Sequence, residues 1–237
     1  MRLYGSHAAE QKLQNLIDIG AKPLSILAFH NKFFEQIRRA FIIGSYYPAL
    51  TAACALGERI LNHLILILRN DFRNTPKHKE VYRKNSFDKW EIAIDCLESW
   101  QVLLPGVVET FRELAKLRHR SIHFNPAVDR DDRPLALQAI KCLNKIIGMQ
   151  FGWPFSGFGS QPWFIPGIRG ESYIKKEFEN EPFIKHIYLP NCHLVGPRNT
   201  LDIVGNRFVV HDDYEYEDIA ISDEQFRDIL TSAKREK

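Results

Sequence analysis

The chain has 237 residues, of which 45% are hydrophobic and 26% are charged, and its formal net charge is +3. This ordinary composition argues against an intrinsically disordered chain, a collagen-like repeat and a coiled-coil rod. The charge is uneven, because residues 1–150 carry a net +7 and residues 151–237 a net −4. That change predicts a domain boundary near residue 150.

The sequence predicts a cytoplasmic protein with no membrane span. Its most apolar run, Leu64–Leu68, is far shorter than the roughly 20 residues that cross a bilayer. The N-terminus lacks the apolar region of a secretory signal. The cysteines lie far apart, so neither a disulfide framework nor a paired-cysteine zinc site is expected, and the thiols should be reduced and mostly buried. The four cysteines are Cys54, Cys96, Cys142 and Cys192.

The first 150 residues carry the hydrophobic periodicity of helices. A first helix is expected from Ser6, as its cap, to Ile19, and a second from Pro23 to Gly44. The third helix has the clearest apolar face, with residues at spacings of three, four and seven: Leu50, Ala53, Cys54, Leu61, Leu64, Ile65 and Leu68. Its other face is polar and carries Glu58, Arg59, Asn62 and His63.

Three further helices follow a polar, basic segment. They are expected from near Phe87 to before Pro105, from Gly106 to about Ile122, and from Pro134 to about Gly148. The pair Asn125–Pro126 ends the second of these, because a residue before proline is driven out of the helical region. Residues 1–150 are therefore predicted to form an antiparallel helical bundle with short connections.

The remaining residues, 151–237, predict a small α+β module. A segment rich in Gly, Pro and aromatic residues, 151–170, should be an ordered connector packed on a surface. A short helix is expected over 171–179. Alternating residues in 183–189 indicate a strand, and those in 201–210 indicate two strands that Gly205–Asn206 joins as a hairpin. Ser222 begins a capping box that opens a terminal helix.

The candidate chemistry lies in the hexapeptide Arg118–His123, at the end of the predicted helix 106–122. Arg118 continues the apolar stripe of that helix, and a guanidinium there is costly unless it is paired or faces a cleft or partner. At 100° per residue, His123 lies about 140° round the helix from Arg118. The two residues can line one cleft only if the last turn bends or a second chain contributes.

Other interpretations of the same residues stay open. His123 near a helix C-terminus can simply complement the helix dipole, and Arg118 can be a structural partner of Glu58 or Glu113. His119 and His123, four residues apart, could hold a metal, but no third and fourth ligands stand nearby in sequence.

With Arg118, His119 and His123 in this order, the chain resembles the HEPN domains, whose signature is Arg, a polar residue, at least three further residues and His at the end of a late bundle helix. His119 takes the polar position. The segment from Gly44 to Glu58 is also similar to the "Gly, Tyr, Ala, then Glu" helix of many members. The resemblance covers roughly residues 24–150 and predicts a mainly α, HEPN-like bundle.

The resemblance implies a metal-independent endoribonuclease, without a cofactor, that acts as a homodimer with the two motif helices facing each other across a basic cleft. Attack of a ribose 2′-hydroxyl on the adjacent phosphate needs a group that moves protons near neutral pH, which suits His123. It also needs a fixed positive charge that makes bidentate hydrogen bonds to the phosphate, which suits the guanidinium of Arg118. His119 would orient His123 or Arg118, or would bind the phosphate itself.

Many such proteins are toxins or antiviral defence effectors held inactive by an inhibitory or antitoxin partner, and this is the biology that the resemblance implies. Some HEPN domains have lost catalysis and serve as dimerisation or nucleotide-binding modules, which is the competing hypothesis. A helical interaction protein with an accidental hexapeptide is a third. Candidate supporting residues are Glu58 and Arg120, and candidate RNA contacts in the basic segment are Arg69, Arg73, Lys77, Lys79, Arg83 and Lys84.

Overall fold

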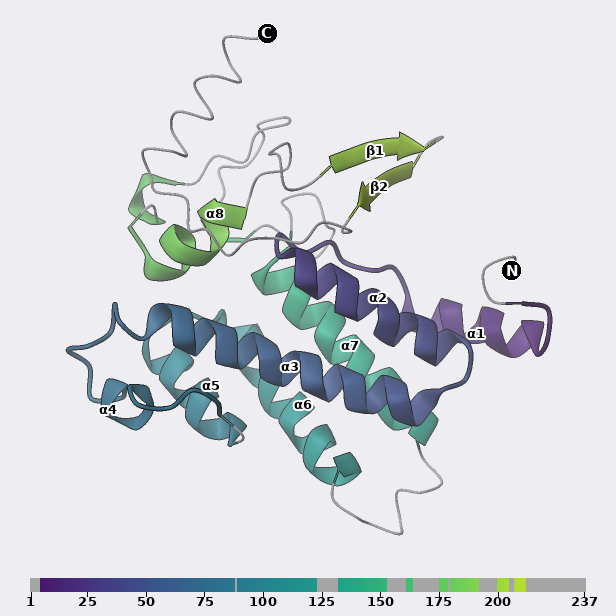
Figure 1. Cartoon of the computed structure of the whole chain (residues 1–237), viewed down its shortest axis with the longest axis horizontal. Coiled ribbons are helices and arrows are strands. Elements are labelled where there is room, and N and C mark those ends of the chain that lie inside the picture. The colour runs from purple at the N-terminus through teal and green to yellow at the C-terminus, as the bar shows by residue number, and fades with distance from the viewer. Residues whose placement is uncertain are drawn as a thin grey trace, which may run out of the picture.

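In its computed structural model, the protein is mainly helical (Figure 1). The structure describes residues 5–87, 89–122, 132–152, 161–163, 175–178, 180–191, 200–204 and 207–211. The main helices are α1 (Ala9–Ile19), α2 (Ala28–Ile42), α3 (Tyr46–Leu68), α4 (His78–Val81), α5 (Trp90–Ser99), α6 (Pro105–Ile122) and α7 (Asp132–Gln150). The predicted helical bundle is confirmed in this coarse form.

The central helix is α3, which packs against α2, α5, α6 and α7 (Figure 1). The residues of its predicted apolar face are buried, and Leu50, Cys54 and Ile65 are at most 1% exposed. The chain enters α3 from α2 through Gly44, whose φ of 88° is a left-handed conformation that glycine adopts without strain.

Among the described residues, α3 is also the one helix long and apolar enough to cross a membrane. Half of its most apolar window is buried inside the bundle.

Two predicted helix starts are wrong. The N-cap residue of α1 is Ala8 rather than Ser6, and Ala8 makes no side-chain cap hydrogen bond. Helix α2 begins at Ala28 rather than Pro23 because Ser25 and Asn31 exchange two hydrogen bonds. The Ser25 N–H donates to Asn31 Oδ1 and Asn31 Nδ2 donates to the Ser25 carbonyl, each at 2.9 Å, so the chain before the helix stays non-helical.

The buried amide of Asn15 joins four helices at one end of the bundle. Its Nδ2 donates to the carbonyls of Phe41 and Ile42 at 3.1 and 3.2 Å and to the Tyr46 hydroxyl at 3.1 Å. Its Oδ1 accepts from Arg133 on α7 at 3.0 Å. Since a buried amide is costly unless it is paired, this network fixes α1 against the ends of α2, α3 and α7.

At the other end of the bundle, Gln150 ties the connection between α5 and α6 to α7. Helix α5 ends where Gln101 adopts a φ of 56°. The buried Gln150 side chain then donates to the Val102 carbonyl and accepts from the Leu104 N–H, both at 3.0 Å. This contact places the start of α6, and hence the register of the motif helix.

The strand predicted from the alternation in 183–189 is wrong. Residues Ile184–Tyr188 form a π-helical turn, followed by α8 (Leu189–Asn191) and preceded by the 3₁₀ turn Lys176–Phe178. The buried residues of this segment have helical spacing and join the bundle core with Phe151 and Trp163: Phe183, Ile184, Ile187 and Tyr188.

Beyond this turn, β1 (Thr200–Val204) and β2 (Arg207–His211) pair antiparallel, with Val204 opposite Arg207. The intervening Gly205–Asn206 and the predicted terminal helix lie outside the described residues. The α+β module and the domain boundary near residue 150 therefore stay predictions.

Candidate functional site

Arg118 lies at the edge of the bundle core, one turn after the buried stripe of α6. Val107, Phe111 and Leu114 are fully buried, whereas the Arg118 side chain is 27% exposed. The stripe predicted for α6 is thus present, and Arg118 is the position at which it meets the surface. A guanidinium at such an edge needs a partner for its charge.

That partner is Glu58 on α3, whose Oε2 lies 3.2 Å from Arg118 Nη2. The same carboxylate oxygen accepts a hydrogen bond from Trp90 Nε1 on α5 at 3.0 Å. The Arg118 guanidinium carbon also lies 5.7 Å from the centre of the Trp90 ring, within cation–π range. These three residues, from three helices, form what we call the Arg118 triad, and they fix the orientation of the guanidinium.

Of the two structural partners considered for Arg118, the structure pairs it with Glu58. Glu113 accepts a hydrogen bond from Gln138 on α7 at 2.8 Å instead. The candidate supporting residue Glu58 therefore lies in direct contact with the motif arginine.

Gly57 lets the triad form, because it allows α3, α5 and α6 to approach closely. A Cβ at Gly57 would lie 2.7 Å from Leu114 Cδ2 and 2.8 Å from Trp90 Cη2, which is closer than side chains tolerate. The next residue along α3 is Glu58, so the close approach brings its carboxylate within reach of both Trp90 and Arg118. Here the absence of a side chain is a packing requirement.

Cys54 lies near the triad on α3 but is not suited to nucleophilic chemistry. Burial raises the pKa of its thiol to about 11, although a hydrogen bond with Ser121 and the charge of Arg118 act in the opposite direction. The thiol is therefore protonated at neutral pH, and the thiolate is the reactive form of cysteine.

A groove runs along the exposed face of α3 beside Arg118. Its volume is about 490 Å³ and it is open to solvent. We call it the α3 groove, and most of the residues that line it have polar side chains: Thr51, Ala55, Glu58, Arg59, Asn62, His63, Leu66, Asn85, Ser86 and Arg118. The polar face of α3 seen in the sequence is the floor of this groove.

Of the two motif histidines, His119 is the one that the structure describes. His119 and Arg120 are exposed on the last turn of α6, and His123 lies outside the described residues. In the part of the chain that the structure describes, no group of three or more His, Cys, Asp or Glu side chains could hold a metal ion. A role for His123 stays a prediction.

The basic segment after α3 is held together partly by its own cations. Arg69 Nη1 donates to the carbonyls of Val81 and Lys84 at 3.2 and 2.6 Å, and Lys77 pairs with Glu80 at 3.0 Å. These contacts give Arg69 and Lys77 structural roles around α4, a short helix that the sequence did not predict.

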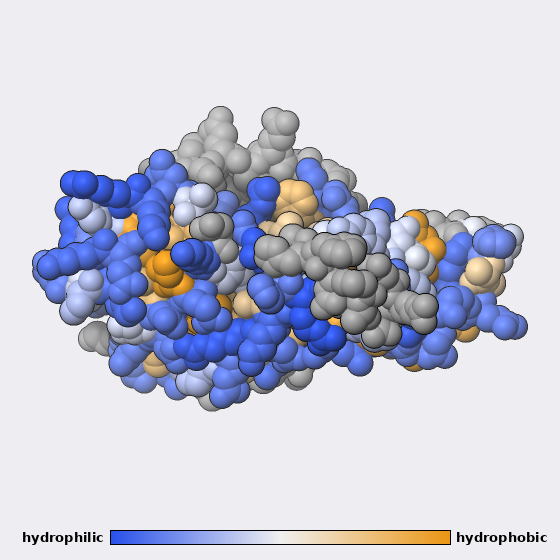
Figure 2. Space-filling view, turned by 90° about the horizontal axis from the view of Figure 1, so that it is seen from below, coloured by the Kyte–Doolittle hydropathy of each residue, from blue (hydrophilic) through white to orange (hydrophobic). Residues whose placement is uncertain are grey.

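The other basic residues of this segment lie on the surface. Arg73, Lys79, Arg83 and Lys84 are exposed, and the Arg83 guanidinium lies 5.0 Å from the Tyr82 ring. Figure 2 shows mostly hydrophilic residues at the end of the molecule that carries α4. Contact between these side chains and RNA stays a prediction.

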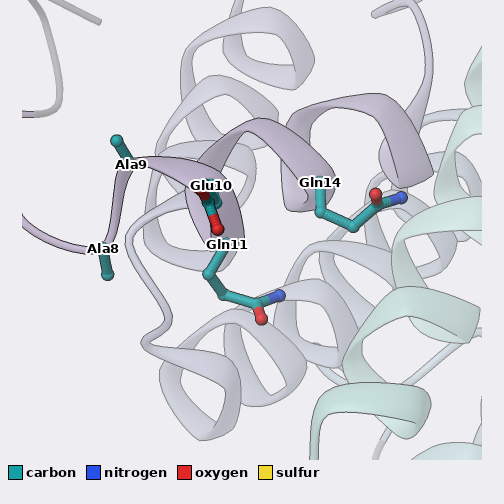
Figure 3. A pocket seen from close by; sticks show the side chains of 5 residues that line it. All are labelled: Ala8, Ala9, Glu10, Gln11 and Gln14. Carbon is teal, nitrogen blue, oxygen red and sulfur yellow. The ribbon is translucent and has the colours of Figure 1, made fainter.

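A second hollow, at the start of α1, offers no comparable set of groups (Figure 3). It is lined by side chains of a single helix and the residue before it: Ala8, Ala9, Glu10, Gln11 and Gln14. Gln11 and Gln14 donate to Asn15 and Asp18, so their amides serve the helix itself.

Trp90 is the member of the site that the sequence did not reveal. It was predicted only as part of a helix, and its indole nitrogen meets Glu58 only through packing of α5 on α3. Arg59 and His63 were visible as polar residues of α3, but nothing in the sequence placed them beside Arg118. No protein-family model, curated protein or solved structure matches this chain.

Proposed function

We propose that this chain is a metal-independent endoribonuclease of the HEPN type that acts as a homodimer. The observation that supports the proposal best is the Arg118 triad. A partly exposed guanidinium, fixed by a carboxylate and an indole, stands on the last turns of the helix that leads into the motif histidine. Such a preorganised cation is what a transition state with a charged phosphate requires.

The proposed reaction is a transesterification within the RNA strand. Neutral His123 takes the proton of a ribose 2′-hydroxyl, O2′ bonds to the adjacent phosphorus, and the bond from phosphorus to O5′ breaks. His123 of the partner subunit, in its protonated form, gives a proton to the leaving O5′. Arg118 holds the non-bridging phosphate oxygens through two N–H groups. The products carry a 2′,3′-cyclic phosphate and a 5′-hydroxyl.

The test uses purified wild-type protein and the His123→Ala and Arg118→Ala variants with total RNA and a tRNA pool in EDTA. His186→Ala is a matched control, because His186 is a surface histidine that contacts Asp71 away from the Arg118 triad. We expect cleavage with cyclic phosphate ends by wild type and by His186→Ala, and none by the other two variants. Equal cleavage by wild type and His123→Ala would contradict the proposal.

A second candidate function is a non-catalytic HEPN-like module for dimerisation or for binding a nucleotide or RNA. The ion pair between Arg118 and Glu58 favours it, because the pair satisfies the charge of Arg118 without any ligand. This candidate predicts RNA or nucleotide binding, or dimer formation, without strand cleavage. Binding measured with His123→Ala and wild type side by side separates the two functions.

We further propose that this protein is a cytoplasmic toxin or antiviral defence effector and that an inhibitory or antitoxin protein is its partner. Expression of wild type and of His123→Ala from an inducible promoter tests this proposal. Growth arrest by wild type alone supports a toxin, and equal growth of the two strains contradicts it. Light scattering of the purified protein over a range of concentrations tests the homodimer.

A further inference from the structure

The α3 groove has two fixed walls. On one side, Asn62 accepts a hydrogen bond from the Phe87 N–H at 2.7 Å and donates to the Glu58 carbonyl at 2.8 Å, which holds the connection containing Asn85 and Ser86 against α3. On the other side, the rings of Phe33 and Phe29 on α2 contact side chains of the floor. The groove is therefore part of the folded bundle.

The floor of the groove carries a positive charge that is held in place. The Arg59 guanidinium lies 4.9 Å from the centre of the Phe33 ring, and among the described residues Arg59 makes no ion pair. His63 lies beside it, with its ring 4.9 Å from that of Phe29. The lining contains one carboxylate, Glu58, which already pairs with Arg118. The charge of Arg59 thus remains available to an anionic ligand.

The groove also leads toward the motif. Along α3, Cys54 forms a hydrogen bond with Ser121 near the end of α6, and Gly57 lies against Leu114 near its middle. Glu58, the residue after Gly57, pairs with Arg118. Helices α3 and α6 therefore run antiparallel. From Leu66 to Thr51 the floor spans about 22 Å of helix. Its Thr51 end lies toward the last turn of α6. A ligand that fills the groove therefore passes Arg118.

We propose that the α3 groove binds a single strand of RNA, with Arg59 on a phosphate that neighbours the phosphate held at Arg118. The choice of RNA as the ligand rests on the proposed function. A basic groove with polar side chains along it fits the backbone and base edges of a single strand. Asn85 and Ser86, both exposed, supply hydrogen-bond donors and acceptors for the bases.

The test measures binding separately from cleavage. A fluorescent 2′-O-methyl oligoribonucleotide of mixed sequence has no free 2′-hydroxyl and cannot be cleaved by the proposed reaction. Its affinity is measured by fluorescence anisotropy at several salt concentrations for wild type, Arg59→Gln and Ala55→Glu. Arg39→Gln is the matched control, since Arg39 is an exposed arginine on α2 that pairs with Glu35 and does not line the groove.

We expect Arg59→Gln to weaken binding about tenfold and to reduce the slope of log K against log salt by about 0.7, the change for one phosphate contact on a single strand. Ala55→Glu, which puts a carboxylate on an exposed position of the floor, should weaken binding at least as much. Arg39→Gln should retain the wild-type affinity and slope. Circular dichroism of each variant confirms that the fold is retained.

The outcomes separate this inference from the ribonuclease proposal. Binding that depends on Arg59 and Ala55, with no cleavage of ordinary RNA by wild type, supports the groove and contradicts the ribonuclease. Cleavage by wild type with unchanged affinity and slope in both groove variants overturns the groove and leaves the ribonuclease. The groove is also overturned if wild type does not bind the oligonucleotide.

Discussion

The Arg118 guanidinium on α6 and the Glu58 carboxylate on α3 form an ion pair, with Nη2 3.2 Å from Oε2. Their side chains are 27% and 35% exposed, so water and salt screen the attraction between them. An ion pair at such a position contributes about 0.2–1 kcal/mol to the free energy of unfolding. The pair therefore does more to orient Arg118 than to stabilise the fold.

Arg118→Ala should abolish RNA cleavage while lowering the free energy of unfolding by only about 1 kcal/mol. Leu114→Ala, one turn earlier on the same helix, removes a fully buried side chain and should cost about 2–5 kcal/mol. Urea unfolding of the two variants and wild type checks both values. A loss for Arg118→Ala as large as that for Leu114→Ala would show that the arginine is structural.

Gly57→Ala should destabilise the protein although alanine favours helices more than glycine does. The gain in helix propensity is about 1 kcal/mol, whereas forcing a methyl group against Leu114 and Trp90 costs about 1–3 kcal/mol. The matched control is Gly106→Ala, whose Cβ meets only the flexible end of Met149 at 3.1 Å. Urea unfolding should show a loss for Gly57→Ala and a change within about 0.5 kcal/mol for Gly106→Ala.

His30 should make the protein less stable in acid. The side chain is fully buried between the Phe29 and Phe151 rings, and burial, aided by the charge of His63, lowers the pKa of His30 to about 3. Its pKa in the unfolded chain is about 6.5. Because the folded state holds the neutral form, this contribution to stability is complete above about pH 6.5 and falls by about 1.4 kcal/mol per pH unit toward pH 3.

His30→Asn provides the comparison, because asparagine keeps a polar group near the Ser25 hydroxyl, which lies 2.9 Å from His30 Nδ1. The free energy of unfolding is measured by urea titration between pH 4.5 and 7.5. The curve of His30→Asn should be flatter than that of wild type below pH 6.5. Parallel curves would contradict the assignment to His30.

The described cysteines should not react with a thiol reagent in the native protein. Burial raises the pKa of Cys54 and Cys96 to about 11 and that of Cys142 to about 12, so all three thiols are protonated at pH 8. A Cys192→Ser variant limits the reaction to these three. Ellman's reagent should detect no thiol in the native variant and three after unfolding in guanidinium, and rapid native labelling would contradict the burial.

The succession of helices along the chain could be predicted from the sequence because apolar residues repeat with the helical period. Leu50, Cys54, Leu61 and Leu68 are buried along one helix, as expected for an element that packs against neighbours on several sides. Helix starts were harder to predict, since they depend on local hydrogen bonds. Ser6 has the right chemistry for a cap but does not serve as one, and Ser25 with Asn31 delays α2 by five residues from Pro23.

The segment 183–189 shows how short patterns mislead. It was interpreted as an alternating strand, but its apolar and polar residues come in pairs, and Phe183, Ile184, Ile187 and Tyr188 lie at helical spacing. In the structure these side chains pack beside Trp163 and Phe151, and this burial favours a helical turn over a strand. Over a run of only seven residues the period is poorly defined, so tertiary contacts decide the conformation.

By itself, the sequence determined a helical bundle, the position of Arg118 at the end of an apolar stripe, and the polar face of α3. Only the tertiary structure decided that Glu58 and Trp90 hold this arginine and that Arg59 stands in a groove beside it. Periodicity is local, because each turn of a helix repeats the same geometry. Contacts between α3, α5 and α6 depend instead on helix register and close approach, which Gly57 allows and no local pattern encodes.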